Sequence, residues 1–493
     1  MQSPNERQGE GILPGPSVCE RSGWTGPAAT RGPRRRREQA RACKADRRAT
    51  RIAGVLLAAL VAATPARASA AESEPLITGQ QDGAAVPDGG TWWERAGATG
   101  DWLGQRTALE RAGVEVFGGY AAEAWGNTTG GLQRGAVYTG MLDWGVTVDF
   151  EQMAGWRGAS AQTTWLWVSG RNASDELVGN LFTVSNLAAL SAVRMLEVWF
   201  EQRFAGDLLS VRIGQITADS EFAVTEVGRL FINSTFGWPS YLSSNLPDSS
   251  PAYPMGALGA RIAAHPTEWL GLQSAAYYGD PFAQDFGSSG FDIDVDDVGW
   301  LWMNELHLDW RGVAGDTAHP GRAAFGFWLH TDQHPAGEPA DLGVYDACHG
   351  FYLVLEQRLV RETGVPATPA TGGDDDAQGL SWFTRIAYSP SGASALHAYI
   401  DTGLAYTGLL PGRDADVVGI GVVWGHVSGS ERDAIAAEGF VPADAELVIE
   451  ATYRWQITPW LALQPDLQVV IDPGARRDLG TAVVTGLRTS IRF

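Results

Sequence analysis

Carboxylate and guanidinium side chains alternate with apolar residues along several segments of this chain. Glu446, Glu450 and Arg454, for example, alternate with a series that includes Leu447 and Trp455. Carboxylates accept hydrogen bonds and arginine donates through a rigid, permanently charged fork, so such a face offers hydrogen bonds in both directions. The pattern predicts one set of candidates for the polar face: Glu197, Glu201, Arg203, Arg212, Glu446, Glu450, Arg454, Arg488 and Arg492.

The elements that position these side chains are extended strands. Successive side chains of a strand face opposite sides, which is the period seen over residues 142–150, 446–458 and 461–471. A tight turn is expected at Thr458-Pro459-Trp460. The last eleven residues alternate in the same way and stop on the aromatic residue Phe493. We expect this final strand to pair with the first one and close the sheet.

Two fold classes fit strands with one apolar and one polar face. A soluble sandwich has one wet face, but its strands are usually about five or six residues long. Here the strands run for about ten residues, and aromatic residues such as Tyr453 and Trp455 lie near their ends, as in the girdles of membrane barrels. The sequence therefore predicts an all-β fold, a transmembrane antiparallel β-barrel over residues 114–493, with the charged face toward the lumen.

The N-terminal region reads as an export signal. Ile52 to Thr64 is an apolar run of 13 residues that follows Arg47, Arg48 and Arg51 and precedes a small-residue A-x-A pattern. A buried helix is the alternative, whereas a membrane-spanning helix would need a longer run. We assign residues 1–70 to a leader and signal peptide. The basic stretch upstream is either a start codon placed too early or a disordered arm for nucleic acid.

Charge and cysteine content exclude several classes of function. Residues 1–70 hold 13 of the 36 basic and 5 of the 57 acidic residues, which leaves 23 basic and 52 acidic residues in the exported part. Such an acidic chain is poorly suited to bind nucleic acid. Cys348 is the one cysteine of that part, and it can form neither an internal disulfide nor a metal site alone. We expect no cofactor and no metal.

The acidic cluster of Asp292, Asp294, Asp296 and Asp297 does not change this expectation. It lacks the glycine and the terminal glutamate of an EF-hand loop. No G-x-S-x-G, H-E-x-x-H or phosphate-binding motif is present either, so the sequence gives no support to an enzyme.

A short helix and several loops complete the predicted organisation. Residues 71–113 form a periplasmic N-terminal segment in which Asp101 to Ala112 is an amphipathic helix, ended by Gly113. Asp280–Gly299, Thr331–Asp346 and Arg361–Gly379 are expected to be loops. Large loops at one end and tight turns at the other are typical of membrane barrels.

Seven blocks of the sequence resemble the bacterial carbohydrate-selective porins of the OprB type. They are GDWLGQR (100–106), GNTTGGLQRGAVYTGMLDWG (126–145), GQITADSEF (214–222), LFINSTFGWP (230–239), PAYPMGALGARI (251–262), DTGLAYTGLLPGR (401–413) and the closing ITPWLALQPDLQVVIDPG…GLRTSIRF. The resemblance covers residues 92 to 493. One departure falls after Asp101-Trp102, where the family usually has Gly-Gly-x-Arg and this chain has Leu103-Gly104-Gln105-Arg106.

The resemblance implies a barrel of about 16 strands in the bacterial outer membrane that passes small sugars, such as the monosaccharide glucose, by passive diffusion. It further implies contact with outer-membrane lipid, a homotrimer, and recognition of Phe493 by the barrel-assembly machinery. Two alternatives stay open on the residues alone. One is a plugged adhesive or lectin-like barrel in the same membrane, and the other is a soluble secreted sandwich.

Overall fold

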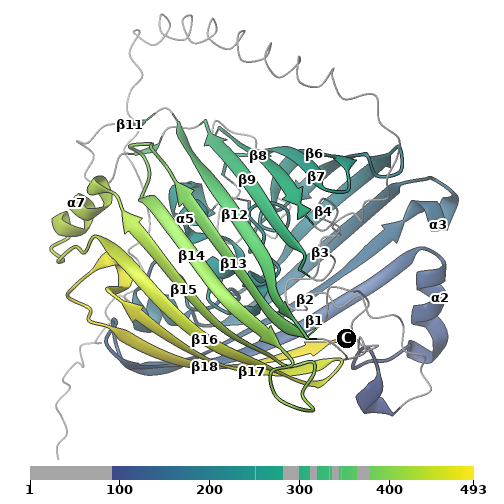
Figure 1. Cartoon of the computed structure of the whole chain (residues 1–493), viewed down its shortest axis with the longest axis horizontal. Coiled ribbons are helices and arrows are strands. Elements are labelled where there is room, and N and C mark those ends of the chain that lie inside the picture. Colours follow the sequence, from purple (N-terminus) through teal and green to yellow (C-terminus); the bar gives the residue numbers. More distant parts are fainter. Residues whose placement is uncertain are drawn as a thin grey trace, which may run out of the picture. The chain divides into compact units, whose positions relative to one another are not determined.

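Sixteen antiparallel strands form one closed barrel, which confirms the predicted fold class (Figure 1). The computed structural model describes residues 91–249, 251–280, 299–310, 319–331, 334–335, 344–345, 347–362 and 378–493. The predicted leader and signal peptide (1–70), the cluster Asp292–Asp297 and most of the three expected loops lie outside these residues. Within the described ranges, no helix has both the length and the apolar character needed to cross a bilayer.

Each barrel strand pairs with the strands that precede and follow it in the barrel, and the last pairs with the first. A separate pair, β10 (His334–Pro335) and β11 (Val344–Tyr345), forms a two-stranded sheet. The barrel strands are β1 (Val114–Thr129), β2 (Gly135–Asp149), β3 (Ala159–Gly170), β4 (Ala192–Phe204), β5 (Leu209–Ile216), β6 (Ala257–Thr267), β7 (Leu270–Tyr278), β8 (Trp300–Asp309), β9 (Gly321–His330), β12 (Cys348–Arg361), β13 (Gly379–Tyr388), β14 (Leu396–Thr407), β15 (Val417–Val427), β16 (Ala445–Thr458), β17 (Leu461–Ile471) and β18 (Ala482–Arg492).

The helices of the described residues are short and lie before the first strand or in the connections between strands. The α-helices are α2 (Gln105–Arg111), α3 (Phe150–Ala154), α4 (Ser234–Gly237), α5 (Ser240–Asn245) and α7 (Gly429–Ala437). The 3-10 and π turns are η2 (Trp92–Glu94), η3 (Trp102–Gly104), η4 (Ser174–Val178), η5 (Gly228–Leu230), η6 (Pro247–Ser249) and η8 (Pro473–Ala475).

The predicted N-terminal helix is shorter than expected and holds the C-terminus at the barrel seam. Its helical core α2 is followed by Gly113, whose φ of +82° suits the helix end. Arg106 donates from Nη1 to the Phe493 carbonyl at 2.9 Å and from Nη2 to the Val116 carbonyl at 3.1 Å. Phe493 N donates to the Gly118 carbonyl at 3.0 Å. The end of the chain is therefore fixed to β1 by hydrogen bonds, in line with the expected closure.

The barrel wall exposes apolar side chains on its outer face and buries polar ones on its inner face, which is the reverse of a water-soluble protein. Outward-facing Ile420, Ile386 and Trp455 are 50%, 46% and 43% exposed, whereas inward-facing Glu446 and Glu450 are 0% exposed. An apolar exposed face and a polar inner face are the arrangement that lipid outside and water inside require.

The two ends of the barrel differ in their connections. At the end where β1 begins and β18 ends, residues 205–208, 268–269 and 459–460 form tight turns. The turn at Pro459-Trp460 is the one predicted from the sequence. Of the expected loops, 280–299 and 331–346 join strands at the other end, whereas 361–379 joins β12 and β13 at the tight-turn end. The predicted separation of long loops at one end from tight turns at the other therefore holds for two of the three expected loops.

Two long connections fold back into the barrel, which the sequence did not predict. We call residues 171–191 the first inward segment and residues 217–256, apart from residue 250, the second inward segment. Phe236 and Tyr241 of the second segment pack against Phe383 of β13 and Trp328 of β9, with ring centroids 6.1 and 6.0 Å apart, and α5 lies among the strands in Figure 1. The inner wall makes room for them at Gly421, where a Cβ atom would lie 2.8 Å from Phe236 Cζ.

Candidate functional site

Acidic side chains of the inner wall accept hydrogen bonds from the backbone of the inward segments. Glu450 of β16 accepts from Ile232 N at 2.6 Å and from Asn233 N at 3.0 Å. Both nitrogens belong to the second inward segment. Because a carboxyl group has two acceptor oxygens, it can accept from neighbouring N–H groups and fix a loop that has no strand partner of its own.

The first inward segment is held in the same way. Glu446, four residues earlier on the same face of β16, accepts from Leu181 N and Phe182 N, both at 2.8 Å. It also accepts from Gly474 N at 2.6 Å. The sequence placed Glu446 and Glu450 on the lumen side, and there they bind backbone in a site closed to bulk water.

Further carboxylates along the wall hold the start of the second inward segment. Glu197 of β4 accepts from Thr217 N at 2.9 Å. Glu305 of β8 accepts from Ala223 N at 2.8 Å, and Glu356 of β12 accepts from Glu226 N at 2.8 Å. The segment is thus attached in turn to strands on several sides of the lumen.

One arginine holds the same segment through its carbonyl groups. Arg385 of β13 donates from Nη1 to the carbonyls of Ala223 and Gly237 at 2.9 and 2.8 Å. Its Nη2 donates to the carbonyls of Thr235 and Phe236 at 2.7 and 2.9 Å. Its charge is balanced by Asp401 of β14, whose side chain is 0% exposed. Arg385 therefore joins the wall to the second inward segment through four hydrogen bonds.

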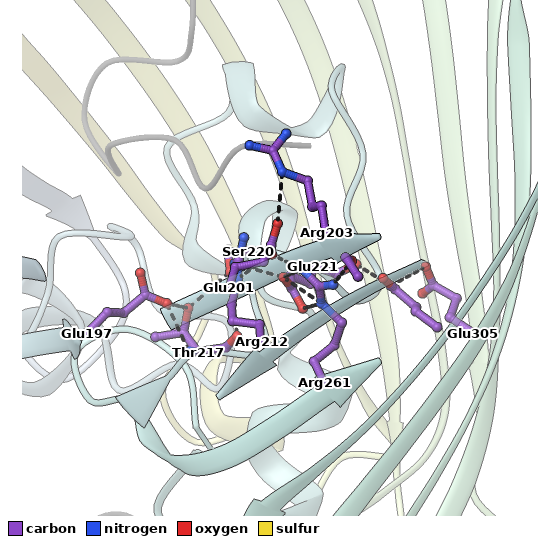
Figure 2. A network of polar contacts seen from close by, with 11 residues as sticks. Glu197, Glu201, Arg203, Arg212, Thr217, Ser220, Glu221, Arg261 and Glu305 are labelled. Carbon is purple, nitrogen blue, oxygen red and sulfur yellow. Dashed lines mark hydrogen bonds and ion pairs between the residues drawn. The ribbon is translucent and has the colours of Figure 1, made fainter. Parts of the chain in front are cut away.

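Two arginines and two glutamates form a balanced cluster where β4, β5 and β6 meet the second inward segment (Figure 2). Arg212 Nε lies 2.9 Å from Glu201 Oε2, and Arg212 Nη1 lies 2.8 Å from Glu221 Oε1. Arg261 Nη2 lies 2.7 Å from the same Glu201 oxygen and 2.9 Å from Glu221 Oε1. Trp199 supports the cluster, since the Arg212 guanidinium lies 4.1 Å from its ring centre.

Glu221 belongs to the inward segment, so its charge matters for how that segment is held. Burial raises the pKa of Glu221, but the guanidiniums of Arg212 and Arg261 lower it by more, and the net pKa lies below the ordinary value for glutamate. The carboxylate stays ionised under neutral conditions and its ion pairs persist.

The remaining predicted residues are more accessible. Arg203 lies beside the cluster, 3.8 Å from Glu201, and its side chain is 27% exposed. Arg488 of β18 pairs with Glu123 of β1, with Nε 2.6 Å from Oε1, and also donates to Asn186 of the first inward segment. Arg454 and Arg492 are partly exposed to solvent.

Sequence reasoning missed several residues of this wall. Glu123, Arg261, Glu305, Arg385 and Asp401 lie on strands, and strict alternation along each strand could have placed them on the polar face. Glu221 could not have been found in this way, because the inward segment has no strand period. Among the described residues, no group of three or more His, Cys, Asp or Glu side chains is placed to hold a metal ion.

The barrel therefore contains two segments that are bonded to its inner wall. Its inner surface holds guanidiniums and carboxylates whose positions are set by ion pairs and backbone contacts. Such groups can exchange hydrogen bonds with polar solutes without moving, since their partners hold them in place.

Comparison with known proteins agrees with this architecture. Residues 133–493 match the family described as "Carbohydrate-selective porin, OprB family". Porin B of Pseudomonas aeruginosa is 24% identical over 431 residues, covering 80% of this chain and 90% of that protein.

Solved structures show the same fold. The high-pH structure of Pseudomonas putida OprB superposes with a TM-score of 0.72 at 22% identity, covering 82% of this chain and all of the other. The low-pH structure of the same protein gives a TM-score of 0.51 at 20% identity over 81% of this chain and 99% of that one. The chain belongs to the OprB family of carbohydrate-selective porins and is an outer-membrane β-barrel of a Gram-negative bacterium.

Proposed function

We propose that this porin is a passive, water-filled channel selective for small sugars, monosaccharides such as glucose among them. The observation that carries the proposal is the attachment of both inward segments to the charged inner wall. A fixed narrowing favours solutes of a limited size, and fixed donors and acceptors favour solutes rich in hydroxyl groups. Sugars combine both properties.

Within this channel we assign two roles to the predicted residues. Glu197, Glu446 and Glu450 hold the inward segments and so set the width of the passage. Solute would meet mainly the more accessible residues Arg203, Arg454, Arg488 and Arg492, while Glu201 and Arg212 keep their cluster rigid. These assignments rest on burial and hydrogen-bond partners.

We propose the partners of this porin from the apolar outer face of the barrel and from the seam between β1 and β18. The exposed apolar band suits outer-membrane lipid and, between copies, a homotrimer. The terminal Phe493, whose backbone is bonded to Gly118 and Arg106, is the residue we propose for recognition by the barrel-assembly machinery.

Swelling of proteoliposomes tests the sugar proposal. Vesicles that contain the protein should swell quickly in glucose, more slowly in maltose, and hardly at all in longer maltooligosaccharides. The variant Glu450→Ala, which loosens the second inward segment, should reduce this dependence on size. Equal rates for all sugars would contradict the proposed narrowing.

A plugged adhesive or lectin-like barrel is the second candidate. It draws support from the inward segments, because Phe182, Phe231, Ile232 and Leu242 are 0–1% exposed and form a packed core inside the barrel. Vesicles that do not swell in glucose at all would favour this candidate over the channel.

A further inference from the structure

The turn before α2 exposes large apolar side chains at the end of the barrel where β1 begins. Leu103 is 103% exposed, so no part of the described chain covers it, and Trp102 is 37% exposed. Leu109 of α2 is 38% exposed. A single exposed leucine is normal for a protein surface. Three large apolar side chains within residues 102–109 instead form a patch that favours contact with another apolar surface.

The backbone of this turn has an unfavourable conformation. Trp102 and Leu103 both have positive φ values, 48° and 62°, which residues with a Cβ atom rarely adopt. Leu103 is also the residue at which this chain departs from the family pattern, where glycine would take such a φ without strain. For the protein alone, a strained leucine that is fully exposed is unfavourable on both counts. The turn therefore points to a contact outside the chain.

The neighbouring residues fix the turn in place. Asp101 Oδ1 accepts hydrogen bonds from Thr107 N at 2.8 Å and from Thr107 Oγ1 at 2.9 Å. The Arg106 guanidinium lies 5.4 Å from the centre of the Trp102 ring. The exposed position of Leu103 is therefore set by bonded neighbours on both sides of the turn.

The same arginine places the turn beside the lipid-facing side of the barrel. Arg106 donates to the carbonyls of Phe493 and Val116 at the barrel seam. Phe493 continues the outward-facing series that includes Leu487, which is 46% exposed. Its ring lies over the outer face, since a Cβ atom at Gly118 would lie 3.6 Å from Phe493 Cδ2. The turn therefore adjoins the apolar outer face at the tight-turn end, which faces the periplasm in bacterial barrels.

The charge of this segment also fits a membrane surface. Residues 91–113 contain three basic and three acidic residues and have no net charge, whereas the exported part contains 23 basic and 52 acidic residues. Arg106 and Glu110 of the segment form an ion pair at 3.5 Å. Anionic headgroups would repel the strongly acidic chain elsewhere but not this neutral segment, and tryptophan is enriched where a membrane meets water. A phospholipid surface is therefore the partner whose chemistry fits the turn.

We propose that Trp102 and Leu103 insert into the periplasmic leaflet of the outer membrane, with Leu109 beside them, so that the segment before β1 anchors the barrel seam to phospholipid. Interfacial segments bury their apolar side chains at the boundary between headgroups and acyl chains. This contact lies outside the barrel wall and does not depend on which solute passes through the lumen.

A fluorescent label at Leu103→Cys tests the contact in purified protein reconstituted into phospholipid vesicles. Lipids brominated near the top of their acyl chains should quench this label about as strongly as one at Ile457→Cys on the outer face, where Ile457 is 36% exposed. The water-exposed control is Ala436→Cys in α7. Iodide on both sides of the bilayer should quench that control about threefold more strongly than the label at residue 103. The unmodified protein, whose Cys348 is 0% exposed, gives the labelling blank.

A second pair of variants tests the turn with the label moved to Leu109→Cys. Leu103→Asp should weaken the quenching of this label by brominated lipid, whereas the matched control Leu103→Met should leave it unchanged. Swelling of the vesicles in glucose reports on the channel separately, and neither variant should alter it.

Three results would overturn the lipid contact. The first is a label at residue 103 that iodide quenches as strongly as the label at residue 436. The second is a label at residue 103 that neither quencher reaches, which would mean that another copy of the chain covers the turn. The third is quenching at residue 109 that Leu103→Asp does not change.

Discussion

Replacing Arg385 by leucine should release the second inward segment from the wall while the barrel itself remains assembled. Arg385 donates to four carbonyls of that segment and balances Asp401, which is 0% exposed. The barrel strands β12, β13 and β14 are held together by their backbone ladders, in which the side chain of residue 385 takes no part. The substitution should therefore destabilise the attachment of the second inward segment and not the pairing of the strands.

The magnitude follows from the burial of this pair. Removing one partner of a buried ion pair costs about 3–5 kcal/mol, because the other charge is left uncompensated. Even the lower value would raise the population of channels with a detached segment on the order of a hundredfold. The double variant Arg385→Leu/Asp401→Leu removes both charges and should recover part of the loss.

Single-channel recording and gel migration together measure this effect. We expect Arg385→Leu to give larger and noisier current steps, with the heat-modifiable migration of a folded barrel retained. Arg432→Leu is the control, since its pair with Asp444 has side chains 38% and 61% exposed and should contribute about 0–1 kcal/mol. Current steps identical to those of the unmodified protein, or failure of the barrel to assemble, would show that Arg385 does not hold the segment independently of the barrel.

Three further predictions concern the outer wall, the packing of the segment and its charge. Ile420 is 50% exposed on the lipid face, so Ile420→Arg should destabilise the folded barrel by about 2–4 kcal/mol if it lies near the midplane. The fraction of protein with heat-modifiable migration should fall, whereas the control Ile420→Val should leave it unchanged. Gly421→Leu should displace the Phe236 ring, destabilise the segment by about 1–3 kcal/mol, and make it accessible to protease in detergent. Because the pKa of Glu221 is lowered, its ion pair with Arg212 should stabilise the segment above the ordinary pKa of glutamate and lose that effect as the pH falls through the lowered value. Channel noise should therefore contain a component that rises only below mildly acidic pH, and Glu221→Gln should remove that component.

The barrel and the facing of its strands could be predicted because each strand carries its own period. Residues 446–458 show this well, because their alternation fixes which side chains face lipid. The turn at Thr458-Pro459-Trp460 joins this strand to its antiparallel partner, with one register shift between Gln456 and Thr458. The helix before the first strand was predictable for a similar reason, since Gly113 marks its end locally.

The inward segments could not be predicted from such patterns. Residues 217–256 have no single period, and their apolar residues, such as Phe231 and Phe236, are buried against the inner wall. Long loops are usually expected from polar, glycine-rich composition, which these segments lack because they are packed. The role of Glu450 was also hidden, because its partners are backbone nitrogens more than 200 residues away in the chain.

We propose that the two inward segments, held by polar side chains of the wall, leave a narrow open passage for sugars. Recording single channels in a planar bilayer while glucose is added tests it most directly. We expect small, steady current steps that decrease as the glucose concentration rises. A silent membrane, or large steps that glucose does not change, would contradict it.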